Sequence, residues 1–255
     1  MNIDVVSVVL CNLDINKYEK VVNDLPDSEK NRVVQYWKIH TIYEVKENAN
    51  GTKKWYRNGK QHRDGDLPAT EWSDGSKEWI RNGKLHRDGD LPAVEYADGT
   101  KEWWKNGKQH RDGDLPAAVW TGSKFWYKND KRHRDGDLPA IENSNGDKEW
   151  WKNNQRHRDD DLPAVVWGDG TREWYKNDMR HRDGDLPAVV WGYGTREWYK
   201  NDMRHRDGDL PARIWNNKKE WYKNDKLHRD GDLPAIEYIT GVKYWYKNGK
   251  EYYPS

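Results

Sequence analysis

The residues with the clearest chemical potential in this sequence are histidine, arginine and aspartate, which recur together in one short phrase. The phrase is His-Arg-Asp-Gly-Asp, as at 181–185, and Leu-Pro-Ala follows it. Two aspartates separated by one residue offer oxygen ligands for Ca²⁺, and histidine is a common ligand of Zn²⁺. The phrase or a near copy occurs at eight histidines: His62, His86, His110, His133, His157, His181, His205 and His228.

Repetition argues against each of these chemistries. His-Arg-Asp occurs in the catalytic loop of protein kinases, but eight copies do not suit one active site, and no kinase glycine-rich loop or Asp-Phe-Gly accompanies them. An EF-hand needs further oxygen ligands, and histidines about 10 Å apart cannot share one Zn²⁺ ion. We therefore predict no catalytic, metal-binding or cofactor-binding residues and no cofactor, and we interpret pairs such as Asp64 and Asp66 as turn residues.

The period of the phrase indicates a tandem repeat. The histidines are 24 residues apart, except for two intervals of 23, and a tryptophan precedes each by seven residues, from Trp55 to Trp221. Two turn signals divide each copy, as in Asn201-Asp202 and Asp169-Gly170, and these residue types tolerate a positive φ. Both short copies lose a residue at the second turn, which is typical of a hairpin tip.

Short segments between the turns are rich in Trp, Tyr, Val and Ile, which favour strands. One predicted strand covers Lys-Glu-Trp-Tyr or its equivalent, as at 101–104. The other begins after the proline, as at 188–191, because proline cannot donate to a ladder. Two strands per copy predict an all-β repeat protein, an elongated single-layer antiparallel meander of β-hairpins in which successive copies lie about 9–10 Å apart.

Alternation along the strands predicts which side chains share a face. Val189 and Trp191 should lie on one face. We expect Trp198 to join that face from across the hairpin and to form a row with its equivalents, while Glu197 and Tyr199 point the other way.

The phrase itself is interpreted as the connector between copies, running along one edge of the sheet. Asp and Gly make the bend, Leu points inward, and Pro-Ala begins the next strand. We expect Arg63 to reach Asp88 or Asp90 of the following copy, with each exposed pair contributing about 0–1 kcal/mol.

Composition supports a folded chain with a thin, aromatic core. Only 34% of residues are hydrophobic, but 17 Trp and 15 Tyr provide large side chains to bury. The net charge of +1 gives no general attraction to nucleic acid or anionic lipid. Cys11 has no second cysteine to pair with, and the apolar run Val5–Leu10 is too short to span a membrane, so we expect a soluble protein without a signal peptide, kept inside a cell.

The stretch Trp-Tyr-Lys-Asn-Gly-Lys-x-His, with Asp-Gly later in each copy, resembles the MORN repeat, over about residues 51–250. The family's glycine two residues before the tryptophan is replaced here by lysine in several copies, and its Gly-x-Gly after the histidine by the longer connector. With its HRDGDLPA connector the chain is similar to repeat proteins of giant DNA viruses of amoebae, of the marseillevirus and mimivirus groups. The resemblance implies a viral source, an elongated single-layer sheet, and roles in scaffolding, dimerisation or membrane and phosphoinositide contact.

Residues 1–50 differ from the array at 51–255, which holds eight full copies of 23–24 residues and a truncated ninth. Asp27 and Glu29 mark a plausible helix start, followed by an apolar face that includes Val33 and Trp37. We predict a small N-terminal α or α/β cap that covers the first edge of the sheet. The alternative is an adaptor module similar to an F-box, although Leu25–Trp37 fits that pattern poorly.

These features predict a non-enzymatic repeat scaffold for protein–protein interaction or self-association, in the host cytoplasm or the virion. An open edge is expected near Tyr252-Tyr253, which favours a homodimer. The alternatives are a peripheral membrane or phosphoinositide-associating protein and an adaptor with a repeat arm. Choline binding by aromatic cages and nucleic-acid binding are disfavoured by the unit length and the balanced charge. Binding would then depend on the copies that deviate from the pattern, at Asn143, Asp160, Tyr193 and Arg213.

Overall fold

A computed structural model describes Pro26 and residues 43–254 of the chain. Within them it contains 34 short β-strands and no helix. The predictions for Val5–Leu10, for Cys11 and for a helix from Asp27 lie outside the described residues. Contacts divide the chain into two units, which meet in the sequence at Lys108 and Gln109, and each is described by itself.

The strands of the two units have the following bounds. Those up to the division are β1 (Glu44–Glu47), β2 (Lys53–Arg57), β3 (Lys60–Gln61), β4 (Thr70–Glu71), β5 (Lys77–Glu78), β6 (Ile80–Arg81), β7 (Lys84–Leu85), β8 (Val94–Glu95), β9 (Lys101–Glu102), β10 (Trp104–Lys105) and β11 (Lys108–Gln109). Those that follow are β12 (Ala118–Trp120), β13 (Ser123–Phe125), β14 (Tyr127–Lys128), β15 (Lys131–Arg132), β16 (Ile141–Glu142), β17 (Lys148–Glu149), β18 (Trp151–Lys152), β19 (Gln155–Arg156), β20 (Val165–Val166), β21 (Arg172–Glu173), β22 (Tyr175–Lys176), β23 (Met179–Arg180), β24 (Val189–Val190), β25 (Arg196–Glu197), β26 (Tyr199–Lys200), β27 (Met203–Arg204), β28 (Arg213–Ile214), β29 (Lys218–Glu220), β30 (Tyr222–Lys223), β31 (Lys226–Leu227), β32 (Ile236–Tyr238), β33 (Lys243–Lys247) and β34 (Lys250–Tyr252).

The first unit is an antiparallel meander. Strand β1 pairs with β2, β2 with β4, and the ladder continues through β5, β8 and β9. Strand β1 lies within residues 1–50 and pairs along the first repeat, with Glu44 opposite Tyr56. The ladder therefore begins before residue 51.

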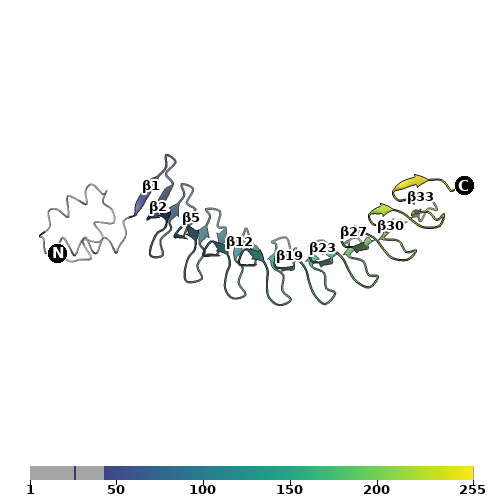
Figure 1. The fold of residues 1–255 in the computed structure, drawn as a ribbon, viewed down its shortest axis with the longest axis horizontal. Coiled ribbons are helices and arrows are strands. Elements are labelled where there is room, and N and C mark those ends of the chain that lie inside the picture. Colours follow the sequence, from purple (N-terminus) through teal and green to yellow (C-terminus); the bar gives the residue numbers. More distant parts are fainter. Residues whose placement is uncertain (1–25, 27–42, 255) are drawn as a thin grey trace. The chain divides into compact units, whose positions relative to one another are not determined.

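The second unit repeats the same plan, with its strands following one another in chain order (Figure 1). The main ladder runs from β12 through β13, β16, β17, β20, β21, β24, β25, β28, β29 and β32 to β33, always antiparallel. The prediction of an all-β repeat protein built as an antiparallel meander of hairpins is confirmed.

Each internal repeat has four strands, so the prediction of two was wrong. Beside the main ladder, every internal repeat carries a second hairpin of two-residue strands, such as β26–β27, in which Tyr199 lies opposite Arg204. Trp198 separates β25 from β26 and belongs to neither. Its backbone N–H donates to Ala212 and its carbonyl accepts from His205, at 2.8 and 3.1 Å. The long predicted strand is thus bent at the tryptophan, which joins the two ladders.

The predicted shared face of Val189 and Trp191 is confirmed, but the faces of the strand across the hairpin were wrong by one residue. Val189 lies opposite Glu197, so the two side chains share a face, and Trp191 reaches the same carboxylate with its indole N–H. Tyr199 also donates to Glu197, while Trp198 lies elsewhere, under an arginine. A shift of one residue in register moves every side chain to the opposite face.

The turns follow the predicted backbone shapes. Asn201 and Asp202 have φ values of 51° and 66°, and two successive positive values give the tight hairpin turn suited to twisted strands. The second turn is longer: Gly170 N–H donates to Trp167, and Gly170 has φ of 86°. The deletion at Thr121-Gly122 reduces this longer turn to two residues, as expected for a hairpin tip.

The buried residues are few and repeat in every copy. The alanine of each connector has no exposed surface, and seven tryptophans of the predicted row are 5–9% exposed. These residues are Ala69, Ala93, Ala117, Ala140, Ala164, Ala188, Ala212 and Ala235, with Trp79, Trp103, Trp126, Trp150, Trp174, Trp198 and Trp221. Together with buried β-branched and polar residues such as Val165, Val189 and Thr171, they form the core that positions the connectors.

Candidate interaction surface

The connector links the second hairpin of one repeat to the main ladder of the next. Between β23 and β24 it runs from His181 to Ala188, and it bends at Gly184, where φ is 70°. A positive φ is unstrained in glycine, which explains the Asp-Gly-Asp at this point. Asp160 takes the glycine position in another repeat and adopts a φ of 60° there.

The connector arginine holds neighbouring repeats together. Arg206 donates two hydrogen bonds to the Asp185 carboxylate of the preceding repeat, at 2.6 and 2.9 Å, and one to the carbonyl of Pro211 in its own connector. Its guanidinium also lies over Trp198, 3.9 Å from the ring centroid. The indole N–H of Trp198 donates to the Asp185 carbonyl at 3.2 Å.

The same link recurs along each unit, and its direction corrects the prediction. Arginine reaches the second aspartate of the preceding repeat, whereas we expected it to reach forward. The pairs are Arg87–Asp66, Arg134–Asp114, Arg158–Asp137, Arg182–Asp161, Arg206–Asp185 and Arg229–Asp209. Arg63, from which we expected a forward contact, instead bonds Pro68 and Glu71 of its own connector and strand. Trp198, which lies under Arg206, donates its indole N–H to the carbonyl of Asp185, so the preceding aspartate is held within reach of the arginine.

Hydrogen-bond donors lower the pKa of both aspartates in the connector. The hydrogen bonds from Arg206 hold the pKa of Asp185 below its usual range. For Asp183, the hydrogen bond from His181 is the main cause, with a further contribution from Lys176. Both carboxylates are more than half exposed, so water screens these interactions and each contributes little to stability by itself.

The connector leucines are exposed, so the prediction that they point inward was wrong. Their exposed fractions lie between 39 and 51%, for Leu67, Leu91, Leu115, Leu138, Leu162, Leu186, Leu210 and Leu233. The alanine two residues later takes the buried place, as at Ala69, whose N–H donates to Glu78 and whose carbonyl accepts from Trp55. An apolar side chain that recurs at a solvent-facing position is available to a partner.

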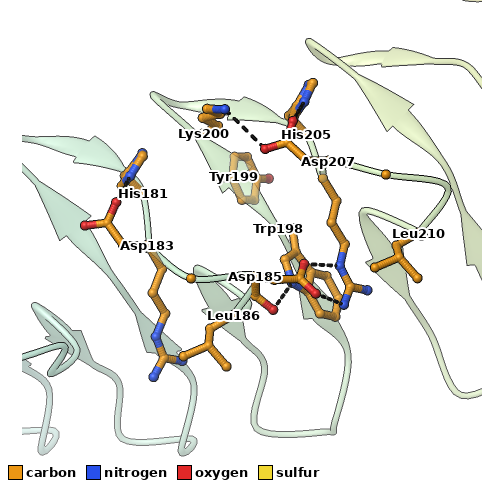
Figure 2. Close-up of a pocket in the computed structure, with 14 residues that line it drawn as sticks. His181, Asp183, Asp185, Leu186, Trp198, Tyr199, Lys200, His205, Asp207 and Leu210 are labelled. Carbon is orange, nitrogen blue, oxygen red and sulfur yellow. Dashed lines mark hydrogen bonds and ion pairs between the residues drawn. The ribbon is translucent and has the colours of Figure 1, made fainter.

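Pockets form between successive connectors within each unit. Figure 2 shows the pocket between His181 and Leu210, in which Asp185 lies between Leu186 and Leu210. Asp183 and Asp207 lie near His181 and His205, respectively. Four equivalent pockets have volumes of about 330 to 480 Å³ and the same types of lining residue. Arginine, aspartate and histidine side chains line all four, and one of them has an additional carboxylate, that of Asp160.

A second cluster, which the sequence did not predict, surrounds a buried glutamate. Glu197 is 2% exposed and accepts hydrogen bonds from Trp191 and Tyr199, each at 2.9 Å. Arg204 and Arg213 lie 3.5 and 3.2 Å from its oxygens. Burial raises the pKa of the Tyr199 hydroxyl. The glutamate that precedes most of the tryptophans in the sequence could have indicated this cluster, but we predicted that it points away from Val189 and Trp191.

The deviant positions occupy different surroundings. Tyr193 is 56% exposed at a turn and stacks on Trp191, with ring centroids 5.8 Å apart. Arg213 lies over Trp215 and between two buried carboxylates. Asn143 closes a turn by bonding Asp147, and Asp160 is exposed in a connector. They do not converge on one site.

In Pro26 and residues 43–254, no group of three or more His, Cys, Asp or Glu side chains is close enough to hold a metal ion. Over the same residues, no helix has the length and apolar character to cross a membrane. No family model and no curated protein matches this chain.

Proposed function

We propose that this chain is a non-enzymatic repeat scaffold that binds protein partners, or further copies of itself, through its connector surface. The observation that carries the proposal is the recurrence of one surface: an exposed leucine beside the same charged groups in each connector. An enzyme needs one constellation that differs from its surroundings, whereas a scaffold gains from many equal contacts, because linked contacts raise the total affinity.

The resemblance of the connector to repeats of giant DNA viruses supports a more specific form of the proposal. The partners are then viral or host proteins, and the site of action is the host cytoplasm or the virion. Immunolocalisation in infected amoebae, with the purified virion analysed in parallel, tests this setting.

Affinity capture of tagged variants tests the binding surface. One variant carries Leu138→Ser, Leu186→Ser and Leu210→Ser. The control carries Met179→Ser and Met203→Ser, which remove apolar side chains of similar exposure, 41 and 42%, from the second hairpins. Quantitative mass spectrometry and light scattering follow the partners and self-association.

The proposal requires that the leucine variant loses specific partners or self-association which the methionine variant keeps. Equal retention by both variants would contradict a role for the connector surface. Flotation with anionic vesicles addresses the lipid alternative: binding that survives in the leucine variant and disappears at high salt would favour an electrostatic membrane role instead.

A further inference from the structure

Each connector histidine contacts two groups, one in its own repeat and one in the next. In Figure 2, His181 lies beside Asp183, and the distance from Nε2 to Oδ1 is 2.9 Å. The other ring nitrogen, Nδ1, accepts the backbone N–H of Asn201 in the next repeat at 3.3 Å. Asn201 is the first residue of the tight turn between β26 and β27.

This arrangement recurs at all eight connector histidines. The Nε2 to Asp distances are 2.8–3.0 Å. The Nδ1 atoms accept from a turn asparagine at 3.0–3.4 Å in the pairs His62–Asn82, His86–Asn106, His110–Asn129, His133–Asn153, His157–Asn177, His181–Asn201, His205–Asn224 and His228–Asn248. Every pair links neighbouring repeats within one unit.

The contacts favour one tautomer of the neutral ring. A backbone N–H is always a donor, so the Nδ1 that faces it carries no proton, and the proton of the neutral ring is on Nε2, which donates to aspartate. A protonated imidazole donates from both nitrogens. Protonation of His181 would place two N–H groups against each other and remove the bond to Asn201.

We propose that the connector histidines form a pH-sensitive latch between neighbouring repeats, closed when the rings are neutral and released when they gain a proton at Nδ1. Histidine is the side chain type whose unperturbed charge changes between about pH 5 and 8, so this is the range in which the proposal is tested. Because the same contact is repeated, acidification weakens every junction that carries one. This inference depends on the contacts between repeats and is independent of the proposed function.

Nearby charges act in both directions on the ring. Asp183 favours a charged ring, but its side chain is 76% exposed and it is already held by Lys176, at 3.1 Å. The remaining charged groups that line the pocket around His181 or lie on the adjacent turn are Arg182, Asp185, Lys200, Asp202, His205, Arg206 and Asp207. Most are paired with one another, as in Lys200–Asp207 and Arg206–Asp185. On protonation of His181, the attraction to Asp183 is weakened by solvent, whereas the hydrogen bond from the Asn201 N–H is lost directly.

The first test is NMR of the full chain labelled with ¹⁵N at histidine. At about pH 7.5 the connector histidines are expected to show an unprotonated Nδ1 and a protonated Nε2. Hydrogen exchange then follows the Asn201 amide. After correction for the intrinsic rate, its opening equilibrium is expected to rise about tenfold or more between pH 7.5 and 5.5, since one released junction exposes the amide.

The matched variant is His181→Asn. The side-chain oxygen of asparagine occupies the place of Nδ1 and accepts the Asn201 N–H without titrating in this range. Its Asn201 amide is expected to change less than about twofold over the same pH interval. Replacing His157, His181, His205 and His228 together by asparagine is expected to halve the fall in the urea midpoint between these pH values.

Either of two results would overturn the proposal: a proton found on Nδ1 of the connector histidines at pH 7.5, or equal pH dependence of the Asn201 amide in the wild-type protein and His181→Asn. If the fourfold variant does not fold, the single variant and the Asn201 amide still decide the question.

Discussion

At the scale of single residues, the connector arginine combines two interactions that are weak apart. Arg206 is 13% exposed at its side chain, stacks on Trp198 and binds Asp185 with two N–H groups. Stacking is favoured by the planar guanidinium, and the fork matches the two carboxylate oxygens. Lysine keeps the charge but reproduces neither geometry. A positive charge alone therefore does not reproduce the contacts of Arg206 with Trp198 and Asp185.

Arg206→Lys is expected to lower the free energy of unfolding by about 1 kcal/mol, because the stacking and the two-pronged bond are lost while the charge remains. Urea unfolding followed by tryptophan fluorescence measures the change. The control is Lys200→Gln, which breaks an exposed pair with Asp207 and should cost less than about 0.5 kcal/mol. Equal effects of the two substitutions would show that Arg206 acts only through charge.

Glu197→Gln is expected to cost about 2 kcal/mol, because Arg204 and Arg213 would lose a buried carboxylate while the side-chain volume stays nearly the same. Glu95→Gln is the control: this carboxylate pairs with Arg87 but is 35% exposed, and its loss should cost less than about 1 kcal/mol. Urea midpoints of the two variants decide the matter. A smaller loss for Glu197→Gln than for Glu95→Gln would contradict the role assigned to the buried cluster.

At the scale of elements, each hairpin packs against the hairpin before it, and the longer turns come closest. A Cβ at Gly192 would lie 2.0 Å from the carbonyl oxygen of Asp169 in the preceding turn. Gly192 N–H also donates to the Thr171 hydroxyl at 3.0 Å. Glycine is therefore needed here for close approach, although its φ is not positive. Ala97 occupies the equivalent place in the first unit, so the turns are not all equally close.

Gly192→Ala is expected to destabilise the protein by about 1–3 kcal/mol, because the added methyl group requires a shift of one turn against the next. Ala97→Gly provides the comparison and should cost no more than about 1 kcal/mol, through backbone entropy. Thermal and urea unfolding measure both. A Gly192→Ala protein as stable as the wild type would mean that the two turns separate freely.

The sequence predicted the period, both turns and the tryptophan row, because these depend on local residue types such as Asn201-Asp202. It did not predict which side of the strand Glu197 occupies. The side on which Glu197 lies depends on the length of the turn at 191–195 and on the bend at Trp198. An error of one residue in the register places every side chain on the opposite face. Leu186 was predicted to point inward, but the connector buries Ala188 instead. Which of the two is buried depends on the packing of neighbouring repeats, which local residue types do not show.

At the scale of the whole molecule, stability is distributed over many similar junctions. The aspartates bound by arginine have pKa values lowered mainly by those hydrogen bonds: Asp66, Asp114, Asp137, Asp161, Asp185 and Asp209. A pKa lowered in the folded state gives stability that is present above the ordinary aspartate pKa and is lost as the pH falls from that value through the lowered pKa. Several small contributions then add.

The protein is therefore expected to lose stability in a further step below about pH 4, separate from any change near pH 6. Urea midpoints measured from pH 5 to 2.5 check this, and 1 M salt should reduce the step because the carboxylates are exposed. Asp185→Asn should remove part of it. A midpoint that stays constant from about pH 4.5 to 2.5 would contradict the ionic junctions.

The central claim is that each repeat depends on its neighbours through the same contacts, and removal of one full period tests it most directly. Deleting residues 172–195 joins Thr171 to Arg196, which recreates the native Thr-Arg-Glu-Trp sequence. Near-ultraviolet circular dichroism and urea unfolding should show a folded protein whose m-value is reduced roughly in proportion to its length. Deleting only residues 172–183 breaks the period and should remove most of the near-ultraviolet circular dichroism signal. If the full-period deletion unfolds the protein as completely as the half-period deletion does, the claim is contradicted.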